Sequence, residues 1–569
     1  MNKIATKHSR NIGLGSLLIA MSVIAYWQVT GLDFIWDDDQ IVAQNPLMRS
    51  LDGLRLIWFD VRAANQYYPV TWTSFWLQRQ IWGLDAAVLH ATNLALHAFS
   101  ALLLWRVLRV LGVPGAWLAA AVFAVHPVHV ESVAWISERK NVLSGVFYLG
   151  SALAYLKFAQ LDRLQAQRKP NWILYLLSLF LFILALLSKT VASTLPVALL
   201  LVLWWKQGHI GRRDVLPFLP FFALGIALGL LTIWLEKVQV GAAGAEWDLS
   251  LIDRCLIAGR ALWFYAGKLA WPDSLTFVYP RWKIDASVWW QYFFPISAAA
   301  LAGGLWLLRG RIGRGPLTAA LYFGLTLGPA LGFFDVYPMR YSFVADHFQY
   351  LASLGPIVLA CAGIQMGLNR LSGHGKAPAL GICALALLVL AALTWLRVPA
   401  FENPGTLWRD TLAKNPAAWM ARGNLAEWHR ARNETEEAIS NYLEALKIEN
   451  PNKDYVHNNL GTYLVLLDRP DEAKVHYAKA IEMRADYALA RYNLAALLIR
   501  EGDFDEAIMH LQKAVSDRPD YQAAHYRLGK VLTKAGRPDE AFDHFVIAAR
   551  LKREVEARGQ PDPLSGDHD

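Results

Sequence analysis

The feature that most constrains this chain is a series of apolar runs, each long enough to cross a lipid bilayer, which ends near residue 398. After about residue 403 the sequence becomes charged and rich in Ala, and no run of that length recurs. With 55% apolar and only 18% charged residues, the chain is too apolar for one soluble core. We therefore expect a polytopic membrane helix bundle over residues 1–400, followed by a soluble module.

Hydropathy predicts about 11 spans, of which the first is an uncleaved N-terminal anchor rather than a secretory signal. The predicted spans are residues 11–29, 88–108, 115–127, 141–158, 171–188, 190–205, 215–235, 288–308, 316–335, 349–369 and 379–397. Lys and Arg gather in short loops between these runs, as expected when the N-terminus is cytoplasmic. The formal net charge of +8 therefore does not indicate a nucleic-acid partner.

One segment, Leu251 to Trp271, leaves the sidedness of the later chain open. Arg254, Arg260 and Lys268 interrupt its apolar pattern, which favours an amphipathic helix at the membrane interface over a span. With this segment excluded, the number of spans is odd and the soluble module emerges on the outer side. If the segment spans the membrane, that module would be cytoplasmic.

The soluble module repeats one pattern about every 34 residues from Trp419 onward: Leu-Gly or Leu-Ala, then Ala, then an aromatic residue or Leu, then Ala. This period is typical of tetratricopeptide repeats, in which each repeat is a pair of helices. We expect an all-α solenoid of about four repeats over residues 403–555, with a leading cap helix at Leu407 to Asn415 and a disordered tail over 556–569. Repeat stacks form concave surfaces, so peptide binding is favoured over a spacer or oligomerisation role.

Ionisable residues near the predicted membrane face are the candidates for a site, since such groups are costly there without a function. Three adjacent carboxylates, Asp37 to Asp39, follow the first span, and their mutual repulsion favours a raised pKa or a cationic partner. A solvated acidic loop is the alternative. Other candidates on the same predicted side are His126, His129, Glu131, Arg139, Lys189, Arg340, Asp346 and His347.

Two of these candidates can be weighed from their surroundings in the sequence. His126, His129 and Glu131 lack the spacing of zinc proteases, which favours a structural or substrate-contact role over metal binding. Lys189 lies between apolar helices, where a lysine favours a strongly charged partner such as a carboxylate or a lipid phosphate. Neither a phosphate-binding loop nor a Ser nucleophile motif occurs, so the sequence gives no support to a hydrolase or an ATPase.

Several motifs, taken together and in order, resemble those of a known family. They are WDDDQ with Asn45-Pro46 downstream, YYPVTW, TNLALHAFSALLLW, HPVHVESVAWISERKNVLS, LLSKTVASTLP and ADHFQYLASLGP, followed by the repeats. The chain resembles the transmembrane-and-tetratricopeptide O-mannosyltransferases and their bacterial relatives, which are polyprenyl-phosphate-sugar transferases of the GT-C class. The resemblance covers nearly the whole chain and implies a GT-C-like membrane domain that transfers mannose or another hexose.

The resemblance also implies a general base. One member of the family's paired acidic motif would accept the proton of a Ser or Thr hydroxyl as it attacks the anomeric carbon, with inversion. Asp38 and Asp39 align best with this pair, while Asp37 occupies the place of the family's aromatic residue. Which Asp acts stays open among these three.

The leaving phosphate would be stabilised by cations at the membrane face. Lys189 matches the family's Ser-Lys and is the first candidate, with Arg139 next. Many relatives have Asp or Glu followed by Arg near the tenth span, whereas here His347 follows Asp346, so Arg340 is a candidate for the missing charge. Tyr350 lies in the same motif, ADHFQYLASLGP, and is a further substrate-binding candidate.

The implied partners are a lipid-linked sugar in the membrane and a protein acceptor held by the repeats. No metal ligands are assigned, although a divalent cation, Mg²⁺ or Mn²⁺, is compatible with the expected reaction as a cofactor. The expected location is a bacterial inner membrane with the repeats in the periplasm. Two alternatives remain: the same donor chemistry on a lipid or polysaccharide acceptor, and a non-catalytic scaffold for an envelope complex.

Overall fold

The computed structural model describes residues 2–64, 66–161, 171–240, 242, 247–372, 375–448 and 453–557. Every regular element in this part of the chain is helical, which confirms the all-α prediction. The chain divides into two compact units, Met1–Asp410 and Thr411–Asp569, so the division falls after the predicted end of the membrane domain. Of the predicted tail, residues 556 and 557 belong to the last helix, and the rest lies outside the described residues.

The helices of the first unit are α1 (Asn2–Tyr26), α2 (Leu51–Phe59), α3 (Pro69–Trp82), α4 (Ala86–Val110), α5 (Ala116–Val125), α6 (Val130–Ala134), α7 (Arg139–Phe158), α8 (Trp172–Leu186), α9 (Leu195–Gln207), α10 (Arg212–Val215), α11 (Leu219–Leu235), α12 (Leu251–Ala270), α13 (Phe293–Ile312), α14 (Gly315–Leu327), α15 (Leu354–Arg370), α16 (Lys376–Arg397) and α17 (Pro404–Lys414). The last of these crosses the division between the units.

Short 3₁₀ or π segments join these helices: η1 (Trp27–Gly31), η2 (Asp39–Ala43), η3 (Pro46–Met48), η4 (Pro127–His129), η5 (Ile136–Glu138), η6 (Thr190–Thr194), η7 (Leu216–Phe218), η8 (Glu236–Val240), η10 (Trp289–Tyr292), η11 (Gly328–Ala330), η12 (Tyr337–Arg340), η13 (Asp346–Gln349) and η15 (Val398–Phe401). Several of them carry the site residues predicted from the sequence.

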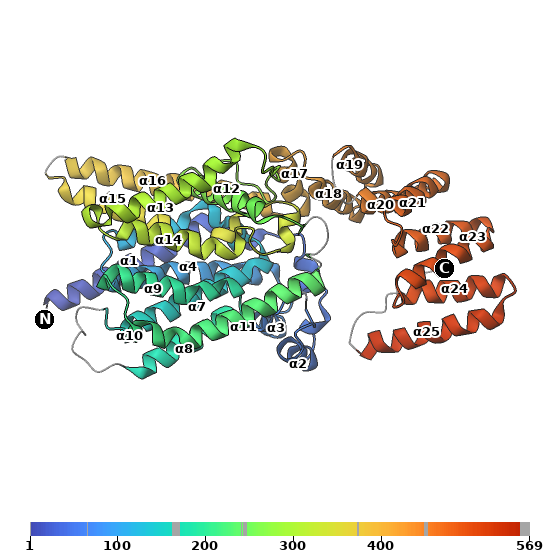
Figure 1. The fold of residues 1–569 in the computed structure, drawn as a ribbon, viewed down its shortest axis with the longest axis horizontal. Helices are drawn as coiled ribbons and strands as arrows, with labels where there is room; N and C mark the ends of the chain where they lie inside the picture. The colour runs from blue at the N-terminus through green and yellow to red at the C-terminus, as the bar shows by residue number, and fades with distance from the viewer. Residues whose placement is uncertain are drawn as a thin grey trace. The chain divides into compact units, whose positions relative to one another are not determined.

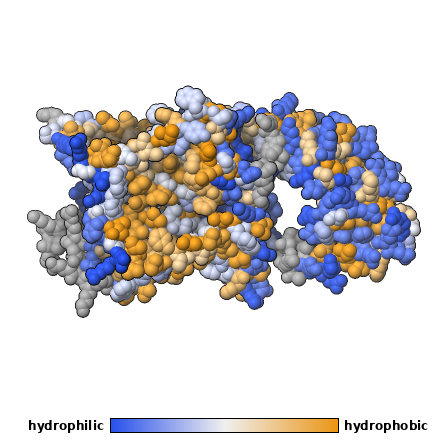
Figure 2. Space-filling view, viewed as in Figure 1, coloured by the Kyte–Doolittle hydropathy of each residue, from blue (hydrophilic) through white to orange (hydrophobic). Residues whose placement is uncertain are grey.

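The long helices of the first unit run side by side as a bundle (Figure 1). Helices α2 and α3, in the first predicted outer loop, lie at the opposite end of this bundle from the N-terminus and from α10, in a predicted cytoplasmic loop (Figure 1). Hydrophobic residues cover much of the bundle's visible surface, as a lipid-facing surface requires (Figure 2). The two predicted sides are therefore at opposite ends of the bundle.

Six helical segments in the described residues are long and apolar enough to cross a membrane, or seven if one bent pair counts as a span. The pair is Ala116–Val125 and Pro127–Ala134, bent by 54°. The number of about 11 spans is thus not confirmed. Predicted spans at 171–188, 316–335 and 349–369 coincide with α8, α14 and α15, whose lengths are only 15, 13 and 17 residues.

Helix α12 occupies the segment on which the sidedness depends. It begins at a capping box in which Ser250 and Asp253 satisfy each other's backbone N–H groups, and it runs for 20 residues. Arg254 donates to Asp335 at 2.8 Å, and Arg260 lies over the Trp282 ring. The helix is not among the candidate spans, which agrees with an interfacial amphipathic helix.

The described residues of the second unit form four antiparallel helix pairs after α17: α18 (Trp419–Ala431) with α19 (Thr435–Lys447), α20 (Lys453–Leu466) with α21 (Pro470–Met483), α22 (Ala488–Glu501) with α23 (Phe504–Asp517), and α24 (Gln522–Lys534) with α25 (Pro538–Ala557). The small residues of the pattern are needed for close packing. A Cβ atom at Gly461 would lie 2.8 Å from the Tyr477 ring, and one at Gly529 would lie 2.8 Å from the Phe545 ring. The predicted repeat architecture is confirmed.

Two histidine pairs join the helices of the second and fourth repeats. The Nδ1 atoms of His457 and His476 are 2.8 Å apart, and those of His525 and His544 are 3.0 Å apart. Such a hydrogen bond needs an unprotonated nitrogen on one ring to accept from the N–H of the other ring. Burial, together with the charges of His476, Lys479 and Lys453, lowers the pKa of His457 to about 4.

We expect the repeats to lose stability on acidification because of these pairs. The pKa of each paired histidine is lowered in the folded state, so the unfolded chain binds more protons as the pH falls from about 7 through the ordinary histidine value of about 6.5. The melting temperature of the repeats should be lower at pH 5 than at pH 7.5. Replacing His476 and His544 by Phe should shrink this difference, and an unchanged difference would contradict the explanation.

Candidate active site

The three adjacent carboxylates of the first outer loop point in different directions. Asp38 is fully buried, and its Oδ1 accepts hydrogen bonds from the backbone N (2.8 Å) and Oγ (2.5 Å) of Ser137. Its Oδ2 accepts from the backbone N of Ile35 at 3.1 Å. Asp39 is exposed and begins η2. Asp38 therefore holds the loop against η5, while Asp39 faces outward.

Asp37 is half-buried, and its Oδ1 accepts a hydrogen bond from the indole Nε1 of Trp135 at 3.1 Å. Burial raises the pKa of Asp37, and the nearby positive charge of Lys140 opposes that rise. Burial also raises the pKa of Asp38, and the charge of Asp37 adds to it. Asp37 is thus less hydrogen-bonded than Asp38 and less exposed than Asp39, and it lies beside a cation.

Glu138 organises the cations beside Asp37. Its carboxylate is buried and bridges two lysines, with Oε1 2.9 Å from the Lys140 ammonium and Oε2 3.0 Å from the Lys189 ammonium. The side-chain amide of Asn141 donates to Oε2 at 2.6 Å. The two ammonium groups hold the pKa of Glu138 well below its usual range, although burial opposes them. Burial lowers the pKa of Lys189 to about 8, and the carboxylate of Glu138 opposes that shift.

A second carboxylate network borders this one. Nδ1 of His347 is 2.8 Å from Oε1 of Glu131, and Nε2 of His347 is 4.0 Å from Oε1 of Glu138. Asp346 is buried and accepts from the Tyr279 hydroxyl at 3.0 Å, while burial raises its pKa. Three of the predicted residues, Lys189, Glu131 and His347, thus come from separate segments of the chain to Glu138 or its immediate neighbours. His347 also packs against the Trp135 ring, which donates to Asp37.

Arg139, the second candidate for the phosphate, lies elsewhere. Its guanidinium is fully buried and donates to Oδ1 of Asn93 at 2.9 Å, to the carbonyl of Leu89 at 2.8 Å and to the side chain of Gln78. The Phe75 ring lies 4.3 Å away. These partners come from α3 and α4, so Arg139 fixes the start of α7 and thereby positions Glu138 and Lys140 on either side of it.

His126, His129 and Tyr350 pack inside the bundle. Nε2 of His126 lies 3.0 Å from the carbonyl of Leu269, and Nδ1 of His129 lies 3.0 Å from the carbonyl of Phe123. The Tyr350 hydroxyl lies 3.0 Å from Nδ1 of His97. All three predicted residues are buried, and their polar atoms contact a backbone carbonyl or another buried side chain, as in a structural core. Among the described residues, no group of three or more His, Cys, Asp or Glu is placed to hold a metal ion.

Arg340 is half-buried at the end of η12, six residues before Asp346.

Lys140 and Glu138 are the site residues that sequence reasoning did not select. The signal was present in the charged triplet Glu138-Arg139-Lys140 at the head of an apolar helix. Successive helical residues point about 100° apart, so three adjacent charges cannot all face one site. The sequence did not show which of them would face it.

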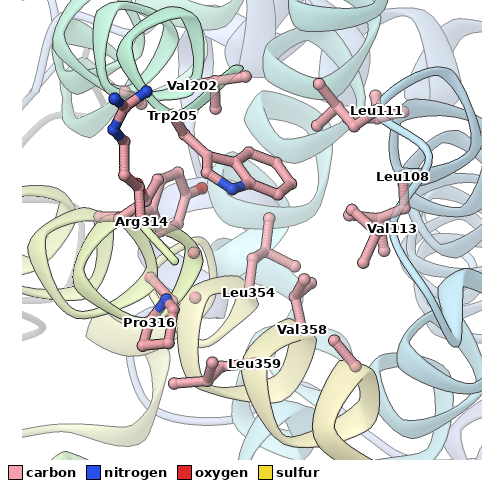
Figure 3. Close-up of a pocket in the computed structure, with 18 of the residues that line it drawn as sticks. Leu108, Leu111, Val113, Val202, Trp205, Arg314, Pro316, Leu354, Val358 and Leu359 are labelled. Atoms are coloured by element: carbon pink, nitrogen blue, oxygen red, sulfur yellow. The ribbon is translucent and has the colours of Figure 1, made fainter. Parts of the chain in front are cut away.

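An apolar cavity of about 490 Å³ lies among the helices that start at this cluster (Figure 3). Its walls come from α4, α7, α9, α14 and α15. Helix α7 starts beside Glu138, α9 starts soon after Lys189, and α15 starts soon after His347. Along α9 the lining runs from Leu195 to Trp205, about 15 Å at the helical rise. None of the charged residues of the cluster lines this cavity: along α7 its lining begins at Tyr148, ten residues and about 15 Å after Glu138. At its other end, near the end of α9, Arg314 lines it (Figure 3).

Comparison with curated proteins finds relatives over most of the chain. It is 26% identical to Protein O-mannosyl-transferase F38B6.6 of Caenorhabditis elegans over 463 residues, which are 76% of this chain and 62% of that protein. It is 24% identical to Protein O-mannosyl-transferase TMTC3 of Mus musculus over 515 residues, which are 82% of this chain and 54% of that protein. The chain therefore spans between about half and three fifths of the length of these relatives.

Two models of the tetratricopeptide repeat match residues 455–487 and 498–542. Among solved structures, the crystal structure of MamA is 20% identical and matches 27% of this chain and 89% of its own, with a TM-score of 0.25. A structure entitled "Crystal structure of YrrB: a TPR protein with an unusual peptide-binding site" is 22% identical and matches 30% of this chain and 85% of its own, with a TM-score of 0.23. The assignment of the repeats rests on the two repeat models and on the helix pairs of the second unit.

Proposed function

Because the chain is similar over most of its length to proteins named protein O-mannosyl-transferase and carries tetratricopeptide repeats, we propose that it is a membrane glycosyltransferase. It moves mannose or another hexose from a polyprenyl-phosphate donor to Ser or Thr of proteins on the outer side of the membrane. The observation that carries this proposal is the half-buried carboxylate of Asp37 beside the Lys140–Glu138–Lys189 cluster, at one end of a helix bundle that also encloses an apolar cavity.

Asp37 acts as the general base in this proposal. It takes the proton of the acceptor hydroxyl while the hydroxyl oxygen bonds to the anomeric carbon and the bond from that carbon to the phosphate oxygen breaks. The donor phosphodiester carries one negative charge and leaves as a phosphate monoester with two. Lys189 and Lys140 lie where they can stabilise that added charge, and Glu138 keeps the two ammonium groups from repelling each other.

The apolar cavity holds a more distant part of the donor's polyprenyl chain. A hydrocarbon chain gains about 0.8 kcal/mol per CH₂ group that leaves water, and the lining of Leu, Val and Ala suits such a chain. With the phosphate at the lysines and the chain in the cavity, the sugar projects away from the bundle toward Asp37. We place the repeats on the same outer side, in the periplasm of a bacterial cell, where they bind the protein acceptor and raise its concentration at the site.

Narrowing the cavity should weaken the binding of long-chain donors. Ala198 is buried in its wall, and Ala198→Phe would fill part of the space that the chain occupies. We expect the KM for a long polyprenyl-phosphate donor to rise about tenfold, the usual cost of a lost methylene or two in an apolar pocket. A donor with the same sugar phosphate on a two-isoprene chain serves as the control, because it should be affected much less. An equal effect on both donors would contradict the placement of the chain.

The rate of transfer should fall on the acidic side at a higher pH than for an ordinary Asp. The base must be ionised, and burial raises the pKa of Asp37, so protonation removes the base before the pH reaches the usual range of Asp. A plot of kcat against pH should therefore show a limb that declines as the pH falls from neutral. A rate that stays constant from pH 7 down to pH 4.5 would contradict the assignment of Asp37.

The experiment that tests the function is mass spectrometry of envelope proteins from cells with and without this protein. We expect hexose increments on Ser or Thr of some proteins to be lost when the gene is deleted. If hexose is lost from a lipid or a polysaccharide instead, that molecule and not a protein is the acceptor. If deletion changes no glycan, the proposed function is wrong.

A further inference from the structure

The residue before Asp37 has an unusual backbone. Trp36 has a φ of +48°, in the left-handed region that residues with a side chain rarely adopt. Such a conformation costs about 1–3 kcal/mol and persists only where the surroundings enforce it. It also turns the chain sharply just before the carboxylates, so that Asp37 faces Trp135 while Asp38 reaches Ser137. The direction of Asp37 therefore depends on whatever holds Trp36.

Aromatic rings hold Trp36. Its ring centroid lies 5.1 Å from that of Trp408, 5.3 Å from Phe277, 6.2 Å from Tyr341 and 6.4 Å from Trp135. Trp408 makes the nearest of these contacts and is only 1% exposed. Because aromatic side chains bury large areas, a ring enclosed in this way can offset the cost of the left-handed backbone.

Trp408 belongs to α17, the helix that the sequence pattern assigned to the start of the repeats. By packing, its first part belongs to the membrane unit, which ends at Asp410. Arg397 and Asp410 pair at 2.5 Å, and the backbone N of Asp33 donates to the carbonyl of Glu402 at 2.9 Å. The segment after the last membrane helix thus contacts the loop of Asp37 at two points, at Asp33 and at Trp36. A domain boundary at residue 403 would separate Trp408 from that loop.

We propose that α17 is part of the catalytic site, in that Trp408 keeps Trp36 in its left-handed conformation and thereby aims Asp37 at the acceptor. Trp36 and Trp408 are positioning residues that act through Asp37. This inference rests on the proposed function for the role of Asp37, but the contact itself does not. Since α17 continues into the repeats, the helix that leads to the acceptor-binding module is the same helix that supports the base.

The test compares Trp408→Ala with Trp408→Phe in the full-length protein. In Trp408→Ala the loop should loosen, so kcat should fall about 10- to 100-fold with little change in the KM for the donor. Because Asp37 becomes more exposed, its raised pKa should decrease, and the acidic limb of the kcat profile should move to lower pH. Trp408→Phe keeps a ring in place and should retain most of the rate and the original profile.

A control separates this role from a general loss of stability. Trp105 is a buried tryptophan of α4, and Trp105→Ala should lower the melting temperature without moving the pH profile. In addition, Trp408→Ala should have little further effect in a Trp36→Gly background, because the contact is already gone and Gly needs no support at positive φ. An unmoved profile, or fully additive effects of the two substitutions, would overturn the inference.

Hydrogen exchange gives a readout that does not need activity. Backbone amides of residues 35–42 should exchange faster in Trp408→Ala than in the wild type, while those of α4 should be unchanged. Unchanged exchange in residues 35–42 would overturn the role of Trp408 even if activity fell. Faster exchange in a protein whose wild type transfers no sugar would support the contact and refute the proposed function, so the two failures can be told apart.

Discussion

Replacing Asp37 by Asn should lower kcat for sugar transfer about 10²- to 10⁴-fold, which is the usual contribution of a general base. The amide has the size of the carboxylate and can still accept the hydrogen bond from Trp135, so the fold should be retained. The measurement is the initial rate of transfer to a Ser- or Thr-containing peptide by purified protein, alongside its melting temperature. A rate within threefold of the wild type would exclude Asp37 as the base.

The two neighbouring carboxylates supply matched controls for this result. Asp39→Asn should leave both rate and stability nearly unchanged, because Asp39 is exposed. Asp38→Asn should instead destabilise the protein by about 1–3 kcal/mol, since the buried carboxylate accepts three hydrogen bonds from Ser137 and Ile35. If Asp39→Asn abolished transfer while Asp37→Asn did not, the base would be Asp39.

Replacing Lys189 by Met should give the second large effect, a loss of about 10²- to 10³-fold in kcat/KM. The ammonium group is placed to stabilise the leaving phosphate, and its loss also leaves the buried carboxylate of Glu138 with one cation fewer. We expect a loss of stability of about 1–3 kcal/mol for that reason. Steady-state kinetics with purified protein measure the loss in kcat/KM, and a thermal unfolding curve measures the loss of stability.

A double substitution separates catalysis from stability at this site. Glu138→Gln removes the buried carboxylate that Lys189→Met leaves with one cation instead of two, so the double variant should regain part of the stability. Its rate should stay low, because the phosphate still lacks Lys189. Recovery of the rate together with stability would show that Lys189 acts only through the fold.

The repeats and the helical nature of the membrane unit were predictable because they rest on periodic patterns. Small residues at fixed spacing predict close helix packing, such as that of Gly461 against Tyr477, and apolar runs predict the long helices. The number of spans was not predictable in this way. Helices such as α14 and α15 are apolar but short, and irregular turns at η11 and η13 adjoin them, so hydropathy alone does not fix the number of spanning helices.

The candidate site was predictable as a set of segments but not residue by residue. Asp37 to Asp39 differ in exposure because of the turn at Trp36, and no local pattern signals a positive φ at tryptophan. Arg139 and Lys140 are adjacent, yet one fills the space between α3 and α4 and the other faces Glu138. Which face each residue takes depends on packing between distant segments. The same holds for Trp408. Its helix resembles a repeat helix in sequence, but its side chain packs against Trp36 in the loop of Asp37.

The most direct test of the central claim uses the purified full-length protein in lipid vesicles, with a polyprenyl-phosphate donor that carries labelled mannose and a peptide acceptor with Ser and Thr. The account predicts that label appears on Ser or Thr of the peptide with wild-type protein and with Asp39→Asn, and is nearly absent with Asp37→Asn. Transfer that is equal in the wild type and in Asp37→Asn, or labelled lipid without labelled peptide, would contradict it.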